Sequence, residues 1–180
     1  VHNRGPDDAP IHLLPQLWFR NTWSWTPGAQ KPKLRARSAN HVTAIHDTLG
    51  EYHGYFDDSP ELLFCENETN VNRLYYTDNG PKFAKDAFHD YVVQGRQEAV
   101  NPHKIGTKSA ALYKLIVPAG KSSSIRVRLC AGATRCPFAD FDAIFAARLR
   151  ETDSFYADIQ KDISDADARN VQRQAFAGMI

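Results

Sequence analysis

Short strand-like runs of apolar residues, separated by polar turn segments, dominate the first two thirds of the chain. Such runs cover residues 41–47, 51–56 and 61–65, and turn-forming residues such as Asp57-Asp-Ser-Pro60 separate them. Short runs of this kind bounded by turn residues are typical of β-strands. We therefore expect short β-strands over these three ranges.

The clearest local pattern predicts a β-hairpin. Residues 111–117 and 124–130 each alternate apolar with polar side chains, and Pro118-Ala-Gly-Lys-Ser122 lies between them. Two alternating runs joined by a short turn are the usual signature of paired neighbouring strands. Arg126 and Arg128 are then expected on the solvent face.

The segments around these runs are less regular. Residues 1–10 are expected to be a linker or an incoming loop, and residues 11–25 are rich in β-branched and aromatic side chains. Several basic residues over 27–40 indicate a solvated loop. Residues 77–110 form a long connection with a possible short helix over 83–93, and its aromatic content favours an ordered structure.

The pattern changes after Pro137 to a helical one. Apolar residues recur on one face over 138–161, which predicts an amphipathic helix. Ser164 and Asp167 resemble a capping box that begins a second helix. We expect this helix to lack a glycine or asparagine cap, and its apolar end at Met179 and Ile180 to need a surface that lies outside these 180 residues.

Composition and charge exclude some classes of function. Apolar residues make up 42% and charged residues 24%, and the net charge is +1. Without a basic stripe or a long apolar run, neither nucleic-acid binding nor membrane binding is expected. Cys65 lies in an apolar run, whereas Cys130 and Cys136 flank a short loop and could meet. We expect reduced, structural thiols and a cytoplasmic location.

The densest polar segment is Glu66-Asn67-Glu68-Thr69-Asn70, which follows a strand expected to be buried. Carboxylates and amides at a strand end can bind sugar hydroxyls or support a pocket. They can equally cap neighbouring backbone groups. The triplet 67–69 also fits an N-glycosylation site, which would require secretion.

A second candidate cluster is Asp86, His89 and Asp90. On a helix the two aspartates share a face, and a carboxylate can orient an imidazole as a base or a metal ligand. No second His or Cys follows at ligand spacing, so we expect a hydrogen-bonded cluster or a substrate-facing loop, with no metal and no cofactor. Acid–base pairs could be assembled from Glu66, Glu68, Asp86 and Asp90, but spacing along the chain does not give their separation.

Three tryptophans, Trp18, Trp23 and Trp25, lie within eight residues. In an extended run Trp23 and Trp25 would point to one face and Trp18 to the other. Aromatic rings can stack on sugars or fill a core. We favour core packing for Trp18 and leave both alternatives open for Trp23 and Trp25.

Several segments, taken in order, resemble one known family. These segments are Leu14-Pro-Gln-Leu-Trp-Phe-Arg-Asn-Thr-Trp-Ser-Trp25, Glu66-Asn-Glu-Thr-Asn70, Lys85-Asp-Ala-Phe-His-Asp-Tyr-Val92, Ala99-Val-Asn-Pro102, Gly106-Thr-Lys108, Val117-Pro-Ala-Gly120, Phe138-Ala-Asp-Phe-Asp-Ala143 and Arg173-Gln-Ala-Phe-Ala-Gly178. From about residue 11 to the end, the chain resembles the microbial and fungal relatives of processing α-glucosidase I, glycoside hydrolase family 63. The residues between Cys130 and Cys136 depart from the family's pattern.

The resemblance implies a mainly β fold, with a β-sandwich followed by C-terminal linker helices. Residues 1–137 would be the sandwich, expected to be incomplete at its N-terminus, 138–163 the linker helix, and 164–180 the start of an (α/α)6 barrel. Such enzymes hydrolyse glycosidic bonds by inversion with a carboxylic acid and a carboxylate base on the barrel. Both groups would lie beyond Ile180, so no catalytic residue is assigned here.

The hypothesis is therefore a non-catalytic sandwich and linker of an inverting α-glycosidase, inactive alone, with the barrel domain missing in cis. Its partner would be an oligosaccharide or glucoside substrate. The residues expected to bind this substrate, as a pocket wall or as stacking platforms, are Glu66, Asn67, Glu68, Asp86, His89, Asp90, Trp23 and Trp25. The alternatives are a stand-alone carbohydrate-binding or interaction module and a compact hydrolase that uses its own carboxylates.

Overall fold

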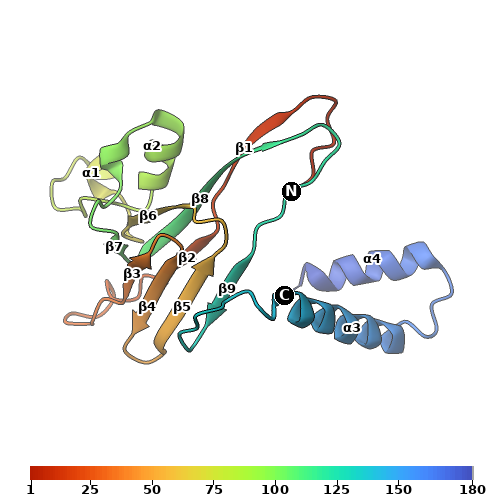
Figure 1. Cartoon of the computed structure of the whole chain (residues 1–180). Helices are drawn as coiled ribbons and strands as arrows, with labels where there is room; N and C mark the ends of the chain where they lie inside the picture. Colours follow the sequence, from red (N-terminus) through yellow and green to blue (C-terminus); the bar gives the residue numbers. More distant parts are fainter. Residues whose placement is uncertain (180) are drawn as a thin grey trace. The chain divides into compact units, whose positions relative to one another are not determined.

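The computed structural model describes residues 1–179. The chain forms two compact units, Val1–Arg135 and Cys136–Ile180. The first unit holds two antiparallel sheets and short helices, and the second holds two longer helices (Figure 1). The fold is mainly β, with C-terminal helices, as the sequence predicted.

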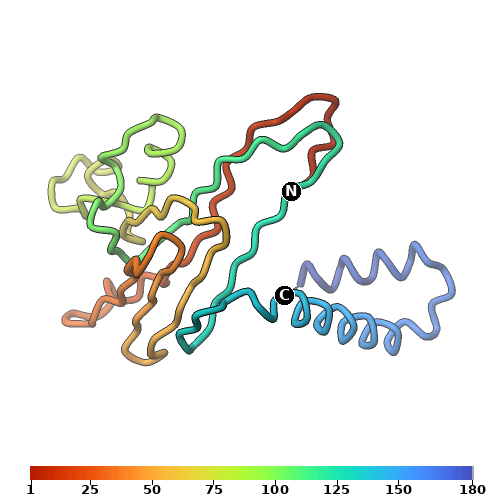
Figure 2. The backbone as a smooth tube through the Cα atoms, in the orientation of Figure 1, coloured from red at the N-terminus to blue at the C-terminus, as the bar shows by residue number. Residues whose placement is uncertain are grey.

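The first sheet is built around one long strand, β8 (Lys108–Val117). Strands β1 (Ala9–Leu13) and β2 (Gln16–Trp18) both pair with one edge of β8 in a single continuous register, which Leu14 and Pro15 interrupt. Strand β6 (Glu61–Cys65) pairs with the opposite edge. Figure 2 shows β1 and the second half of β8 extending together beyond the rest of this sheet.

The second sheet has five strands in the order β7-β3-β4-β5-β9. Strands β3 (Lys33–Ser38), β4 (His41–His46) and β5 (Gly50–Phe56) form a meander, and short strands β7 (Ile105–Gly106) and β9 (Val127–Cys130) lie at its edges. The strands expected over 41–47, 51–56 and 61–65 are thus confirmed. The basic segment 27–40, expected to be a loop, contributes β3.

The predicted hairpin of 111–117 with 124–130 is wrong. Strand β8 belongs to the four-stranded sheet, whereas β9 pairs with β5 in the other sheet. Strands β1 and β2 pair with one edge of β8, and β6 pairs with the other edge as far as Leu112. The intervening residues run beside the N-terminus instead, where Asn3 N–H donates to Lys121 O at 2.9 Å.

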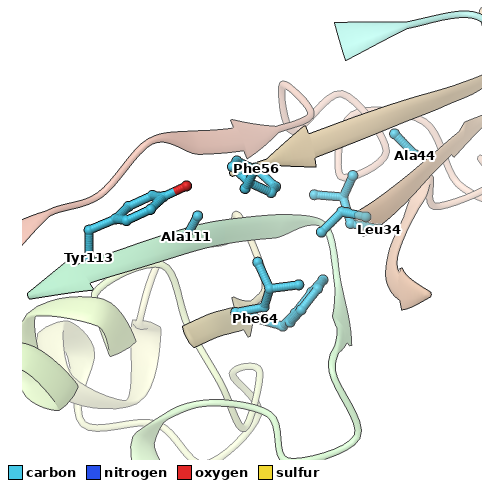
Figure 3. Close-up of a cluster of buried hydrophobic side chains, with 8 residues drawn as sticks. Leu34, Ala44, Phe56, Phe64, Ala111 and Tyr113 are labelled. Carbon is cyan, nitrogen blue, oxygen red and sulfur yellow. The ribbon is translucent and has the colours of Figure 1, made fainter. Parts of the chain in front are cut away.

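The main core lies between the two sheets (Figure 3). Alternate residues of each strand point toward this core. The side chains that close this core come from both sheets and are Leu34, Val42, Ala44, Phe56, Leu62, Phe64, Ala111 and Tyr113.

The outer face of the four-stranded sheet is covered by helix α2 (Ala87–Gln94). Phe88 and Ala87 of this helix are buried against Leu63, Cys65 and Leu112 of the sheet. The short helix predicted within 83–93 is confirmed, with its start moved to Ala87. A one-turn helix, α1 (Val71–Tyr75), and a 3-10 turn, η1 (Gln97–Ala99), flank α2 in the sequence.

The chain passes from one sheet to the other at Thr107. Gly106 ends β7 in the five-stranded sheet, and Lys108 begins β8 in the other sheet. A Cβ on Gly106 would stand 2.2 Å from the carbonyl oxygen of Cys65, so only glycine fits this corner. Buried Thr107 is thereby held beside the end of β6.

The second unit is a pair of helices, α3 (Phe141–Ile159) and α4 (Ala166–Ala177). Gln160 Nε2 donates to Arg169 O at 2.8 Å, and Tyr156 and Phe176 place their ring centroids 6.4 Å apart. The helix predicted within 138–161 is confirmed.

Two details of α4 correct the sequence analysis. Asp165, not Ser164, is the N-cap, because its carboxylate accepts the Ala168 N–H at 2.8 Å. The helix also ends at Ala177, where Gly178 N–H bonds back to the last turn, so a glycine does follow it. Met179 is exposed as expected, and Ile180 lies outside the described residues.

Candidate functional site

An open groove lies beside the end of β6, and its lining combines polar side chains with apolar surface. We call it the polar groove. Its volume is about 520 Å³. One wall comes from the loop after β2 and the other from the segment around α1. The lining residues are Asn21, Ser24, Glu68, Thr69, Val71, Tyr75, Thr77, Asn79, Gly80 and Pro81.

Glu68 connects this groove to the loop that follows β2. Lys31 Nζ lies 2.5 Å from Glu68 Oε1 and 3.0 Å from Glu66 Oε2, so a single ammonium bridges both carboxylates. Burial acts to lower the pKa of Lys31, but the hydrogen bonds to Glu68 and Glu66 outweigh it and raise the pKa. The two glutamates therefore hold the 19–32 loop through Lys31.

Asn67 and Thr107 complete this attachment. Asn67 Nδ2 donates to Phe19 O at 2.8 Å, and its backbone N–H donates to Thr107 Oγ1 at 2.8 Å. Thr107 Oγ1 in turn donates to Glu66 Oε2 at 2.8 Å. Since Thr107 sits at the corner between the sheets, the corner fixes the geometry of the whole polar segment.

The three tryptophans lie in different environments. Trp23 is half-buried, and its Nε1 donates to Glu68 Oε1 at 3.1 Å, so it belongs to the support of the loop. Trp25 is 64% exposed, with the Arg20 guanidinium 5.2 Å from its ring centroid. The prediction of core packing for Trp18 is wrong, because that side chain is 54% exposed. Residues 23–25 form a turn, so Trp23 and Trp25 are not on one face of a strand.

Asp86 and Asp90 form a second support, for the other wall. Asn70 caps α1 through Arg73 N–H at 3.1 Å and donates to both carboxylate oxygens of Asp86 at 3.1 Å. Arg73 lies 3.3 Å from Asp86 and 3.6 Å from Asp90, while Arg96 lies 3.2 Å from Asp90. These contacts hold α1 against α2.

His89 does not join the two aspartates. Its side chain is exposed and makes no hydrogen bond or ion pair within residues 1–179. The carboxylate–imidazole arrangement, the less favoured alternative for this cluster, does not form, because Asp86 and Asp90 both face Arg73 while His89 lies aside. The two aspartates are hydrogen-bonded instead, to Asn70, Arg73 and Arg96. Within residues 1–179 we find no group of three or more His, Cys, Asp or Glu side chains that could hold a metal ion.

The polar groove is an open groove whose two walls are held in place by ion pairs and hydrogen bonds. Of the eight predicted residues, Glu68 alone lines the polar groove. Glu66, Asn67 and Trp23 anchor one wall, and Asp86 and Asp90 anchor the other. For residues 66–70 the sequence left open pocket support or capping of nearby backbone groups. Asn70 does both, because it caps α1 and also donates to Asp86 in the support of the groove wall.

Sequence reasoning missed Lys31, Thr107 and the groove-lining residues Asn21, Ser24 and Tyr75. Lys31 lies in a segment that its charge made us interpret as solvated. Thr107 carries no pattern of its own. Its neighbour Gly106 was the one available signal, because a lone glycine beside a strand marks a close backbone approach.

Comparison with known proteins places the chain beside one relative. The chain is 34% identical over 219 residues to a Saccharomyces cerevisiae (strain ATCC 204508 / S288c) protein whose printed name is uncharacterized protein YMR196W. The alignment covers the whole of this chain and 20% of the yeast protein, so the chain spans about one fifth of that relative's length. No family model matches the chain. No solved structure matches it.

The helices of this chain were also compared with the length and apolarity that a membrane span requires. Within residues 1–179, none of them is long and apolar enough to cross a bilayer.

Proposed function

We propose that this chain is the non-catalytic sandwich and linker part of an inverting α-glycosidase that hydrolyses glycosidic bonds in oligosaccharides or glucosides. The catalytic acid and base would lie on an (α/α)6 domain in the same polypeptide. The polar groove would form part of the substrate-binding surface. The proposal includes a cytoplasmic location, which rests on the cysteine usage of the sequence.

One observation carries the proposal, namely that the candidate carboxylates are committed to ion pairs. Lys31 bridges Glu66 and Glu68, and Arg73 and Arg96 contact Asp86 and Asp90. An inverting pair needs one protonated acid and one carboxylate base, with room for a water molecule between the base and the sugar. Carboxylates held by cations favour a supporting role over acid–base catalysis.

The lining of the polar groove supports a carbohydrate as the ligand. Asn21, Ser24, Thr69 and Asn79 offer amide and hydroxyl groups, and Tyr75 adds an exposed aromatic ring. Sugars combine hydroxyl groups with apolar C–H faces, so hydrogen-bonding groups beside a ring match their surface.

Substitutions of the groove in the longer protein test this role. Asn21→Ala and Tyr75→Ala should each raise KM about fivefold with little change in kcat, the loss expected for one contact of about 1 kcal/mol. Gln94→Ala, exposed at the end of α2, is the matched control and should leave both constants unchanged. Unchanged KM in both groove variants would contradict the assigned groove.

The rival hypothesis of a compact hydrolase makes the opposite prediction. If Glu68 were a catalytic acid or base, Glu68→Gln would abolish turnover. We expect Glu68→Gln to alter KM more than kcat, because it weakens the Lys31 contact that holds the loop.

A further inference from the structure

One edge of the four-stranded sheet is open along β2. Phe19 N–H donates to Thr107 O, and Ala111 N–H donates to Pro15 O. In an antiparallel pair this pattern alternates, so odd-numbered residues of β2 bond to β8. The backbone groups of Gln16 and Trp18 therefore point away from β8, and within residues 1–179 no other strand pairs with β2.

The five-stranded sheet has an uncovered stretch on its core-facing side. Tyr52 lies opposite Ala44, and Val127 lies opposite Phe56, in the strand register. Cross-strand partners share a face, and Ala44 and Phe56 belong to the core. Tyr52 and Val127, with Leu129 two residues further on, thus face inward, yet Tyr52 is 36% and Leu129 55% exposed.

An apolar groove of about 230 Å³ lies where these two features meet, and we call it the apolar groove. It opens between the end of β2 and strands β4, β5 and β9. The lining residues are Leu17, Trp18, Phe19, Ala44, His46, Leu49, Gly50, Tyr52 and Leu129. A lining with so few hydrogen-bonding side chains suits an apolar side chain better than a sugar.

We infer that a further β-strand of the same polypeptide, from outside residues 1–180, pairs with the open edge at Gln16–Trp18 and fills the apolar groove. Main-chain hydrogen bonds at Gln16 and Trp18 would fix the strand, and its alternate side chains would cover Tyr52 and Leu129. The inference does not depend on the sugar-binding role proposed above.

The length of the relative favours a strand of the same chain. The match spans 20% of the yeast protein, so a polypeptide of that kind has four fifths of its length left to supply a strand. A strand tethered to the sheet is present at a high effective concentration, which a second molecule lacks. An open edge beside exposed core-facing residues would otherwise favour aggregation.

Residue-resolved hydrogen exchange on the full-length protein tests the inference. Leu17 N–H faces β8 and should be protected in every case, which makes it the internal control. Gln16 and Trp18 should exchange at least about a hundredfold more slowly than unprotected amides in a monomeric sample. Rapid exchange at both amides would overturn strand addition. Protection that appears only as the protein dimerises, measured by sedimentation, would overturn the same-chain strand in favour of a second copy.

A proline variant gives a second readout in the same protein. Gln16→Pro removes an N–H that points away from β8, a position that an edge strand tolerates. The substitution should abolish protection at Trp18 while Ala110 of β8 stays protected. Undiminished protection at Trp18 would count against pairing at this edge.

Discussion

Lys31 is the residue on which the proposed loop geometry depends most. It joins the 19–32 loop to Glu66 and Glu68, two half-buried carboxylates that would otherwise face each other without a cation. Because the contact is partly exposed, solvent screens it, and its value lies in fixing the loop more than in the stability of the whole unit.

Lys31→Met should lower the free energy of unfolding by about 1 kcal/mol, within the range for partly exposed ion pairs. Lys33→Met, which removes a neighbouring exposed lysine, should change it by less than about 0.5 kcal/mol. Urea unfolding of the three proteins at neutral pH measures the difference. Equal losses for both variants would show that the contacts of Lys31 have no special role.

The ion pairs of Lys31 with Glu66 and Glu68 also predict how the stability of the protein depends on pH. The folded protein raises the pKa of Lys31 above its ordinary value of 10.5, so the stabilisation is complete below pH 10.5 and is lost as the pH rises through the folded-state pKa. The stability of wild type and Lys31→Met should therefore converge in alkaline urea titrations. A constant difference would contradict this assignment.

Cys65 should be chemically inert in the folded protein. It is fully buried beneath α2, and burial raises the pKa of its thiol to about 12. Since the thiolate is the reactive form, iodoacetamide at pH 8 should label exposed Cys136 and reach Cys65 only in denaturant. Peptide mass spectrometry measures the labelling of both cysteines. Rapid labelling of Cys65 in the folded protein would contradict the prediction and show that α2 separates from the sheet.

At the scale of elements, two supports position the polar groove. Lys31 ties the loop after β2 to the end of β6, and Arg73 ties α1 to α2. The first support also rests on the corner at Thr107, where the chain changes sheets and Thr107 contacts Glu66 and Asn67. The corner has no tolerance for a side chain at Gly106.

Gly106→Ala should destabilise the protein by at least about 2 kcal/mol, because its Cβ would overlap the backbone of Cys65. Gly132→Ala is the matched control, since no atom lies within 4 Å of its Cβ position. That variant should stay within about 0.5 kcal/mol of wild type. Thermal unfolding measures both, and failure of Gly106→Ala to fold agrees with the prediction. A Gly106→Ala protein as stable as wild type would contradict the prediction.

Asp86→Ala should release α1 without unfolding the sheets, because it removes partners of Asn70 and Arg73. Trypsin should then cleave after Arg73 and Lys82 about tenfold faster, as expected when a local support of about 1.4 kcal/mol is lost. Asp78→Ala changes the charge of the same segment, and Asp78 is exposed and makes no ion pair within residues 1–179, so this variant should cleave at the wild-type rate.

Local patterns predicted the elements better than their pairing. The strands within residues 41–65 could be predicted because each is a short run of strand-forming residues bounded by turn residues. The hairpin of 111–130 was mispredicted because alternation marks a strand but does not identify the neighbour it pairs with. Residues 113–117 of β8 pair with β1, which lies about a hundred residues earlier in the sequence.

Candidate residues were predicted by type, but their roles were not. Of the clustered carboxylates, Glu68 lines the polar groove, while Glu66, Asp86 and Asp90 hold the neighbouring segments through ion pairs. Their cations, Lys31 and Arg73, come from other segments. Distances between segments follow from tertiary packing, so the sequence could not reveal that these carboxylates are paired.

At the scale of the whole molecule, the chain combines a sheet unit bearing a supported groove with a separate pair of helices. It spans one fifth of its yeast relative, and we place the chemistry of the proposed glycosidase elsewhere in the longer protein. The ion-paired carboxylates are the reason for that placement.

Glucose release from α-glucosides by residues 1–180, beside a longer form that continues through the sequence after residue 180, tests this claim most directly. We predict release by the longer protein and none by residues 1–180. Turnover by the short chain would contradict the account and make Glu66, Glu68, Asp86 and Asp90 the candidate acids.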